Sequence, residues 1–199
     1  MASKKTLNAK NLEELGAARL AQLLIEISTG NALAKRRLRL ELAGAQCPGE
    51  VACEVDKRLS QIRRSRSFVD WQNRKALIAD LQTQRKAIVE QVAQSDPAEG
   101  LALMWRFLGL ASSIFGRCDD SSGMVIAIFH EAVADLAEIA VRANPRPEVL
   151  GDAVYDALTA NEYGQYDDLI GTLAPVLGER GLTYLRGRMT APVSYTHLT

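Results

Sequence analysis

Residues 95–142 constrain the fold more than any other part of the chain, because they predict two apolar helices joined by a short polar turn. Asp96, Pro97 and Glu99 place three helix-start signals within a few positions. The apolar residues that follow have helical spacing and share one face: Leu101, Met104, Trp105, Leu108, and Ile114 or Phe115. A helix with one apolar face needs a partner that covers this face.

The second helix of this segment has an equally wide apolar face, and Ser121 or Ser122 is expected to cap its N-terminus. The face consists of Val125, Ile128, Phe129, Val133, Leu136, Ile139 and Ala140. Two helices joined by a turn of a few residues lie antiparallel with their apolar faces in contact. Because such a hairpin leaves the outer sides of both faces exposed, the sequence predicts further helices on either side of it.

Capping residues and apolar spacing predict three helices near the N-terminus. Asn11 is expected to cap a first helix that runs through Ile27. Asn31 and Pro48 are expected to begin the second and third helices. The third helix ends in the basic, serine-rich sequence RRSRS.

A long fourth helix is predicted from Phe68 to about Ala93, with Ser67 and Asp70 as its capping box. Phe68 and Trp71 fall on the apolar stripe of this helix. We therefore expect both aromatic side chains to lie in the core.

The segment after the central pair continues the helical pattern. Residues 144–147, with the sequence NPRP, end one helix and begin the next, and Pro175 keeps the last helices short. About nine helices and no strand predict an all-α fold of stacked antiparallel helix pairs, similar to an α-solenoid. Residues 1–190 are expected to form a single helical-repeat-like domain, the N-terminal part of a longer protein. Residues 191–199 are expected to be a disordered or artefactual tail.

The formal net charge is zero, but the charges are unevenly distributed along the chain. Residues 1–90 carry 17 Lys and Arg against 10 Asp and Glu, a charge of +7, and residues 91–199 carry 7 against 14, a charge of −7. The basic half contains a candidate binding surface made of Arg36, Arg37, Arg39, Arg63, Arg64 and Arg66. Such a surface attracts nucleic-acid phosphates, or it pairs with acids of the same chain, another copy or another protein.

These patterns leave two functions open. The first is a helical-repeat protein-interaction module or scaffold, whose partner is an unidentified protein or a second copy of the chain. The alternative is a nucleic-acid-binding module that uses the basic N-terminal half, although no helix-turn-helix or other nucleic-acid motif is evident. No catalytic residue, cofactor or metal site is predicted, so the sequence favours a protein without enzymatic activity of its own.

Several polar residues are candidates for chemistry, but a structural role explains each of them better. His130 has no second catalytic group at an identifiable spacing. Asp119 and Asp120 lack the spacing of a calcium-binding loop, and Cys118 lacks a histidine partner placed by a known signature. A structural role is also expected for the remaining candidates: Asp152, Asp156, Tyr163, Tyr166, Asp167 and Asp168.

The composition argues against a membrane protein and against export. The chain has no run of eighteen apolar residues, which excludes a membrane-spanning helix. Its basic N-terminus is followed by an amphipathic segment with acidic residues, which does not resemble a signal peptide. Cys47, Cys53 and Cys118 lack Cys-x-x-Cys spacing, so we expect reduced thiols and a cytoplasmic location.

Five segments carry a family resemblance: KKTLNAKNLEELGAARLAQLLIEI, KRRLRLELAG, RSFVDWQNRKALIADLQTQRKAIVEQV, DPAEGLALMWRFLGLA and NEYGQYDDLIGTLAPVLG. Together they resemble DUF6880, a bacterial family of helix-rich proteins of unknown function, over roughly residues 4–189. The resemblance implies a helical fold and a longer protein with further helices downstream, but no reaction, cofactor or catalytic residue. The C-terminal sequence PVSYTHLT separately resembles translated sequencing-adaptor read-through.

Overall fold

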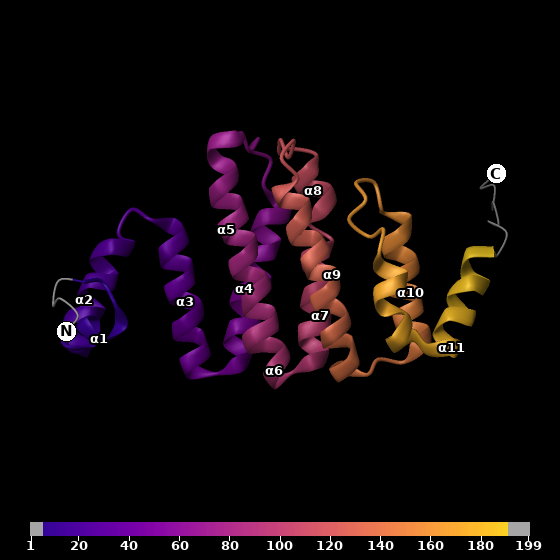
Figure 1. Cartoon of the computed structure of the whole chain (residues 1–199), viewed down its shortest axis with the longest axis horizontal. Helices are drawn as coiled ribbons and strands as arrows, with labels where there is room; N and C mark the ends of the chain where they lie inside the picture. Colours follow the sequence, from indigo (N-terminus) through magenta and orange to yellow (C-terminus); the bar gives the residue numbers. More distant parts are fainter. Residues whose placement is uncertain (1–5, 191–199) are drawn as a thin grey trace, which may run out of the picture.

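The computed structural model describes residues 6–190, most of which are helical (Figure 1). The helical segments are α1 (Ala9–Glu13), α2 (Ala17–Ser28), α3 (Ala32–Gln46), α4 (Pro48–Arg64), α5 (Trp71–Ala87), the π-helix η1 (Ile88–Val92), α6 (Ala93–Ser95), α7 (Pro97–Leu108), α8 (Ala111–Phe115), α9 (Met124–Ala143), α10 (Pro147–Thr159) and α11 (Leu169–Thr190). These described residues contain no strand, and the prediction of an all-α fold is confirmed. The predicted tail at residues 191–199 lies outside the described residues.

The helices stand side by side in a row that follows their order in the sequence (Figure 1). At the centre of the row, α7 and α9 pack against each other as the predicted antiparallel pair. Helices α4 and α5 and the π-helix η1 pack against this pair on one side, and α11 packs against it on the other. The prediction that neighbouring helices cover both sides of the central pair is therefore confirmed.

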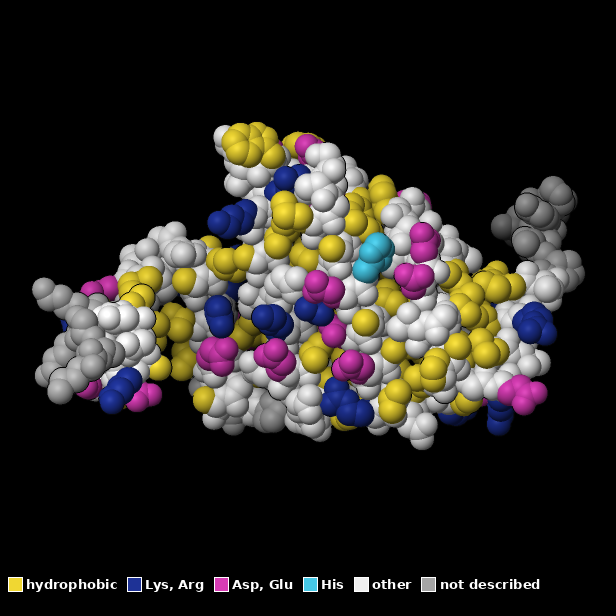
Figure 2. Space-filling view, in the orientation of Figure 1, with side chains coloured by type: hydrophobic (Ala, Val, Ile, Leu, Met, Phe, Trp, Pro, Cys, Tyr) yellow, Lys and Arg dark blue, Asp and Glu magenta, His cyan; other side chains and the backbone are white. Residues whose placement is uncertain are grey.

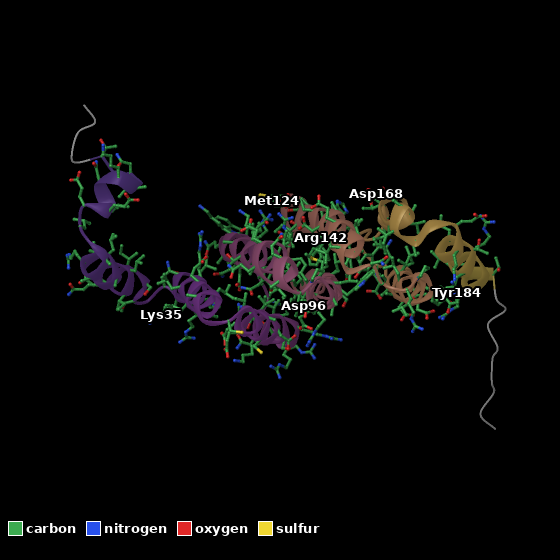
Figure 3. All side chains as sticks on the ribbon, turned by 90° about the horizontal axis from the view of Figure 1, so that it is seen from below. Lys35, Asp96, Met124, Arg142, Asp168 and Tyr184 are labelled. Carbon is green, nitrogen blue, oxygen red and sulfur yellow. The ribbon has the colours of Figure 1, made fainter. Side chains whose placement is uncertain are left out.

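The apolar faces of α7 and α9 form the centre of the hydrophobic core. Their buried residues include Met104, Phe107, Leu108, Val125, Ile128, Phe129, Val133, Leu136, Ile139 and Ala140. Asp96 caps α7 as predicted, because its carboxylate accepts hydrogen bonds from the amides of Ala98 and Glu99 at 3.1 and 3.0 Å. Arg142 of α9, marked in Figure 3, donates to the carbonyl of Ala93 at 3.2 Å and ties α9 to α6.

The predicted start of the first helix is wrong. Asn8 caps α1, because its side chain accepts a hydrogen bond from the amide of Asn11 at 2.9 Å. Gly16 then adopts φ 76° and ψ 158°, a conformation open to glycine but strained for other residues. The predicted single helix is therefore divided at Gly16 into α1 and α2.

The predicted serine cap of α9 is also wrong, although the hydroxyl of Ser122 accepts a long hydrogen bond of 3.5 Å from the amide of Met124. The carboxylate of Asp120 accepts hydrogen bonds from the amides of Val125 and Ile126 at 3.0 and 2.8 Å. Gly123 occupies the N-cap position with φ 69°. A carboxylate accepts hydrogen bonds from these free amides, and its negative charge is favourable at the positive end of the helix dipole. A serine hydroxyl carries no such charge.

The predicted core position of Phe68 and Trp71 is wrong as well. Their exposed fractions are 68% and 69%. Asp70 caps α5 through the amide of Asn73, so Phe68 precedes the helix in an extended segment. There, Val69 pairs with the backbone around Cys118 and packs on the core. Because successive side chains of extended backbone point to opposite sides, the side chain of Phe68 points away from the core.

The turn between α6 and α7 brings two backbones into contact at Gly100. A Cβ atom at this position would lie 2.5 Å from the Cβ of Ala93 and 2.8 Å from its Cα. We expect Gly100→Ala to lower the free energy of unfolding by about 1–3 kcal/mol, because one of the two helices must move. Urea denaturation at neutral pH measures this loss.

Gly171→Ala is the matched control for this substitution. A Cβ atom at Gly171 would meet no other atom within 4 Å, and the residue lies within helix α11. This variant is expected to keep or raise the unfolding free energy by up to about 1 kcal/mol, because alanine favours the helix. Equal losses in the two variants would contradict the close approach at Gly100.

Candidate functional site

Two polar residues lie on the buried face of α5, between apolar neighbours at helical spacing. Asp80 is 2% exposed and Gln84 is 1% exposed. They follow Leu77 and Leu81 by three residues, so they occupy positions where the stripe predicts apolar side chains. A buried carboxylate and amide are costly without partners, which makes this part of α5 the first place to look for a site.

Asp80 joins three helices. Arg58 of α4 donates to its carboxylate oxygen Oδ2 from Nε at 2.8 Å and from Nη2 at 2.5 Å. Arg36 of α3 donates to the same oxygen at 3.4 Å, and Nε2 of Gln84 donates to Oδ1, also at 3.4 Å. We call Asp80, Arg36, Arg58 and Gln84 the Asp80 cluster. The cluster holds α3, α4 and α5 together through charged hydrogen bonds.

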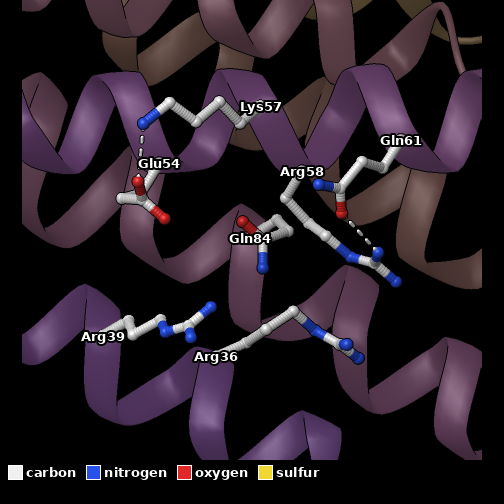
Figure 4. Close-up of a pocket in the computed structure, with 7 residues that line it drawn as sticks. All are labelled: Arg36, Arg39, Glu54, Lys57, Arg58, Gln61 and Gln84. Atoms are coloured by element: carbon white, nitrogen blue, oxygen red, sulfur yellow. Dashed lines mark hydrogen bonds and ion pairs between the residues drawn. The ribbon is translucent and has the colours of Figure 1, made fainter.

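A polar pocket of about 260 Å³ lies beside this cluster, between α3, α4 and α5 (Figure 4). We call it the arginine pocket, and its lining residues are Arg36, Arg39, Glu54, Lys57, Arg58, Gln61 and Gln84. Figure 4 shows the side chains of α3 and α4 surrounding Gln84, which comes from α5. The pocket therefore combines positive charges from two helices with a buried amide from a third.

The cationic side chains around the pocket differ in whether a carboxylate neutralises them. Nζ of Lys57 lies 2.8 Å from Glu54, whose hydrogen bond and charge raise the pKa of Lys57 and keep its ammonium protonated at neutral pH. Arg58 and Arg36 share the carboxylate of Asp80. Within residues 6–190, Arg39 makes no ion pair, although it lines an adjoining hollow together with Glu50 and Glu54. Arg39 is thus a cation available to a ligand.

Two buried atoms at the pocket have no hydrogen-bond partner in the described structure. They are Nε of Arg36, which is a donor, and Oε1 of Gln84, which is an acceptor. Most buried polar atoms in proteins are satisfied, so these two atoms mark a place where a further group is expected to bind.

The structure divides the predicted basic surface among three places. Arg36 and Arg39 line the arginine pocket, whereas Arg37 lines a different groove between α3 and α5. Arg63 and Arg64 are exposed in the last turn of α4, where cations complement the helix dipole, and Arg66 is exposed just after it. Of the six arginines, only Arg36 and Arg39 line the arginine pocket.

The family of the chain follows from a model-based comparison. The model of DUF6880, described as a family of unknown function, matches residues 2–197. The chain belongs to the DUF6880 family. No curated protein and no solved structure matches it. The resemblance predicted from the five sequence segments is confirmed, and it adds no reaction or ligand to the DUF6880 chain.

Sequence reasoning missed Asp80 and Gln84 of this DUF6880 chain, although a signal was present. Both residues interrupt an otherwise apolar helical stripe, and a polar residue on such a stripe needs a buried partner. The partners were hidden because Arg36 lies 44 residues before Asp80 and Arg58 lies 22 residues before it.

The acidic turn before α9 has a structural role. Asp119 accepts a hydrogen bond from the amide of Ser121 at 3.0 Å, which lowers the pKa of Asp119. Asp120 caps α9. Burial, with a smaller contribution from Asp120, raises the pKa of the Cys118 thiol, so this thiol is protonated at neutral pH and a poor nucleophile.

His130 and Asp152 are also held by contacts with neighbouring residues. Nε2 of His130 lies 3.3 Å from the carbonyl oxygen of Gly164. Asp152 accepts hydrogen bonds from Tyr184 at 2.9 Å and from Arg188 at 2.5 Å. Within residues 6–190, no group of three or more His, Cys, Asp and Glu side chains is arranged to hold a metal ion, and no helix there has the length and apolarity to cross a bilayer.

The turn between α10 and α11 buries one tyrosine and exposes another. Tyr163 is 43% exposed and stacks on Phe115, with ring centroids 5.0 Å apart, whereas Tyr166 is 4% exposed. Burial raises the pKa of Tyr166 to about 12, because the phenolate loses its hydration.

We expect the free energy of unfolding of the DUF6880 chain to fall at alkaline pH because of Tyr166. The unfolded tyrosine has a pKa of about 10, so the folded state binds the phenolic proton more tightly. The resulting contribution to stability is complete below pH 10 and is lost as the pH rises toward about 12. Urea denaturation at several values between pH 8 and pH 11 should show this loss, and Tyr166→Phe should reduce its slope. An unchanged slope in Tyr166→Phe would contradict the assignment.

Proposed function

We propose that the chain is a helical protein-interaction module that binds its partner through the apolar face of α2. This face consists of Leu20, Leu23, Leu24 and Ile27, and we call it the α2 stripe. Leu24 and Ile27 are 48% and 69% exposed, and Leu20 and Leu23 are half-buried. The exposure of this stripe is the observation that carries the proposal.

The position of α2 explains why its stripe is exposed. Helix α2 lies at the N-terminal end of the row, where α1 and α3 are its main neighbours (Figure 1). Figure 2 shows hydrophobic side chains exposed around these N-terminal helices, next to a hollow. Burying an exposed leucine or isoleucine contributes about 1.5–3 kcal/mol, so a partner that covers the stripe gains a large favourable term.

The spacing of the stripe indicates the chemistry of the partner. Four aliphatic side chains at helical spacing form a ridge that fits the apolar face of another amphipathic helix. The partner surface is therefore a helix with aliphatic residues at the same spacing, supplied by another protein or by a second copy of the chain. We place this interaction in the cytoplasm, in keeping with the free thiols of Cys47, Cys53 and Cys118.

Site-specific photo-crosslinking tests the proposal in living cells. A benzophenone amino acid at Leu24 or Ile27 should give a specific adduct, and the same probe at the exposed Glu179 should not. The mass of the adduct separates a second copy from another protein. Leu23→Glu should reduce the adduct from Ile27 about tenfold, because a charge is costly in an apolar interface. Equal labelling from Leu24 and Glu179, or none from Leu24 and Ile27, would contradict the proposal.

Nucleic-acid binding is the second candidate, and the exposure of Phe68 and Trp71 favours it. Exposed aromatic rings stack on unpaired bases, and Phe68 lines a groove that also contains Arg36, Arg58 and Arg117. Fluorescence anisotropy with labelled single strands and duplexes, at low and moderate salt, tests this function. Binding that weakens in Trp71→Ala supports it, and the absence of binding at low salt excludes it.

A further inference from the structure

We propose that the arginine pocket binds a small phosphate ligand that also presents a hydroxyl group, either inorganic phosphate or a phosphomonoester with a neighbouring hydroxyl. The α2 stripe contributes no residue to this pocket, so the inference is independent of the interaction proposed above. It rests on the charge of the pocket, on the two unpartnered buried atoms and on the volume.

The charge of the pocket selects an anion. Four cationic side chains, Arg36, Arg39, Lys57 and Arg58, face the two carboxylates of Glu54 and Asp80, which leaves two positive charges in excess. Arg39 has no carboxylate partner within residues 6–190. Guanidinium groups form strong hydrogen bonds with phosphate oxygens, and the partly buried position of Arg36 and Arg58 strengthens such bonds further.

The two unpartnered atoms select the hydrogen-bonding pattern of the ligand. Nε of Arg36 requires an acceptor, which a phosphate oxygen supplies. Oε1 of Gln84 requires a donor, which a fully ionised anion lacks and a hydroxyl supplies. The orientation of the amide is fixed, because Nε2 of Gln84 donates to Asp80, and a rotated amide would place two oxygens against each other.

The volume selects a small ligand. A pocket of about 260 Å³ has room for a phosphate group with a short carbon skeleton, since a water molecule in the liquid takes up about 30 Å³. A DNA backbone does not meet the hydrogen-bonding requirement at Gln84, because a phosphodiester has no P–OH group and deoxyribose has no 2′-hydroxyl. The expected ligand is therefore different from a DNA strand.

Isothermal titration calorimetry of the full chain at pH 7 and low ionic strength tests this inference. The probes are inorganic phosphate, sulfate and glycerol phosphate. Sulfate has the charge of a phosphate dianion but no hydroxyl donor, so we expect phosphate to bind about tenfold more tightly or better. Tighter binding of glycerol phosphate than of inorganic phosphate assigns the pocket to a phosphomonoester, and the opposite order assigns it to free phosphate.

Two variants of α3 with the same charge change separate the pocket from general attraction. Arg39→Gln removes the unpaired cation of the pocket and should weaken phosphate binding about tenfold. Arg37→Gln makes the same change in the other groove and should weaken binding less than about twofold, the effect expected of a distant, screened charge. Gln84→Met should bring the affinities for phosphate and sulfate close together, because it removes the acceptor.

Three outcomes would overturn the inference. One is the absence of binding by phosphate and glycerol phosphate at millimolar concentration. Another is equal affinity for phosphate and sulfate in the unmodified chain, since Gln84 would then have no part in recognition. The third is an equal loss of affinity in Arg37→Gln and Arg39→Gln. Both arginines are exposed, so these two variants are expected to fold even if Gln84→Met is unstable.

Discussion

Phe129→Ala is expected to lower the free energy of unfolding by about 3–5 kcal/mol, the range for loss of a buried phenylalanine side chain. Phe129 is fully buried between the two central helices. Its ring lies 5.6 Å from the ring of Phe107 on α7 and 5.5 Å from that of Phe115 on α8, measured between centroids. Alanine would leave a cavity at the point where three helices meet, and Phe107, which is itself fully buried, is held in place by its own packing.

Phe68→Ala is the matched control, because the same atoms are removed from a side chain that is 68% exposed. This variant is expected to change the unfolding free energy by no more than about 0.5 kcal/mol. Guanidinium denaturation, followed by far-ultraviolet circular dichroism and by tryptophan fluorescence, measures both variants and checks that unfolding is two-state. A similar loss in both variants would show that Phe68 is packed, contrary to the structure.

Asp80→Ala is expected to cost about 3 kcal/mol, because it leaves two arginines without their shared carboxylate. Removal of one partner from a buried ion pair costs about 3–5 kcal/mol, and the low end applies because the side chains of Arg36 and Arg58 remain 29% and 24% exposed. Glu26→Ala breaks an ion pair of two side chains that are both about half exposed, and should cost less than about 1 kcal/mol.

A double-mutant cycle isolates the contribution of the Asp80 cluster. Once Asp80 is replaced by alanine, Arg58→Met should restore part of the lost stability, because an apolar side chain no longer leaves a charge without a partner. Urea denaturation of the two single variants and the double variant gives the interaction free energy. If the two losses simply add, the hydrogen bonds between Asp80 and Arg58 do not contribute to stability.

The central helices could be predicted from the sequence because their signals are local. The cap at Asp96 and the start at Pro147 need only a few neighbouring residues, and the apolar faces of α7 and α9 repeat often enough to define a period. The predicted helices were wrong at Gly16 and at Phe68. In both cases the apolar spacing was extended through a residue that lies outside the helix.

The candidate site was far less accessible to sequence reasoning. The basic residues of α3 were recognised, but a list of arginines does not show that Arg37 and Arg39 lie in different grooves. Their separation depends on where α4 and α5 pack against α3. The role of Gln84 depends on the same packing. Its hydrogen-bond partner Asp80 lies on its own helix, but the pocket that it lines is formed with residues of α3 and α4.

The order of the helices along the row has a consequence for how the chain folds. Helices that are close in sequence are also close in space, so most contacts require the closure of only a short loop (Figures 1 and 3). Short loops cost little entropy and favour rapid folding. Folding can begin at the α7–α9 hairpin and spread to both ends, and the end that carries α2 is then the last to acquire neighbours and the first to lose them.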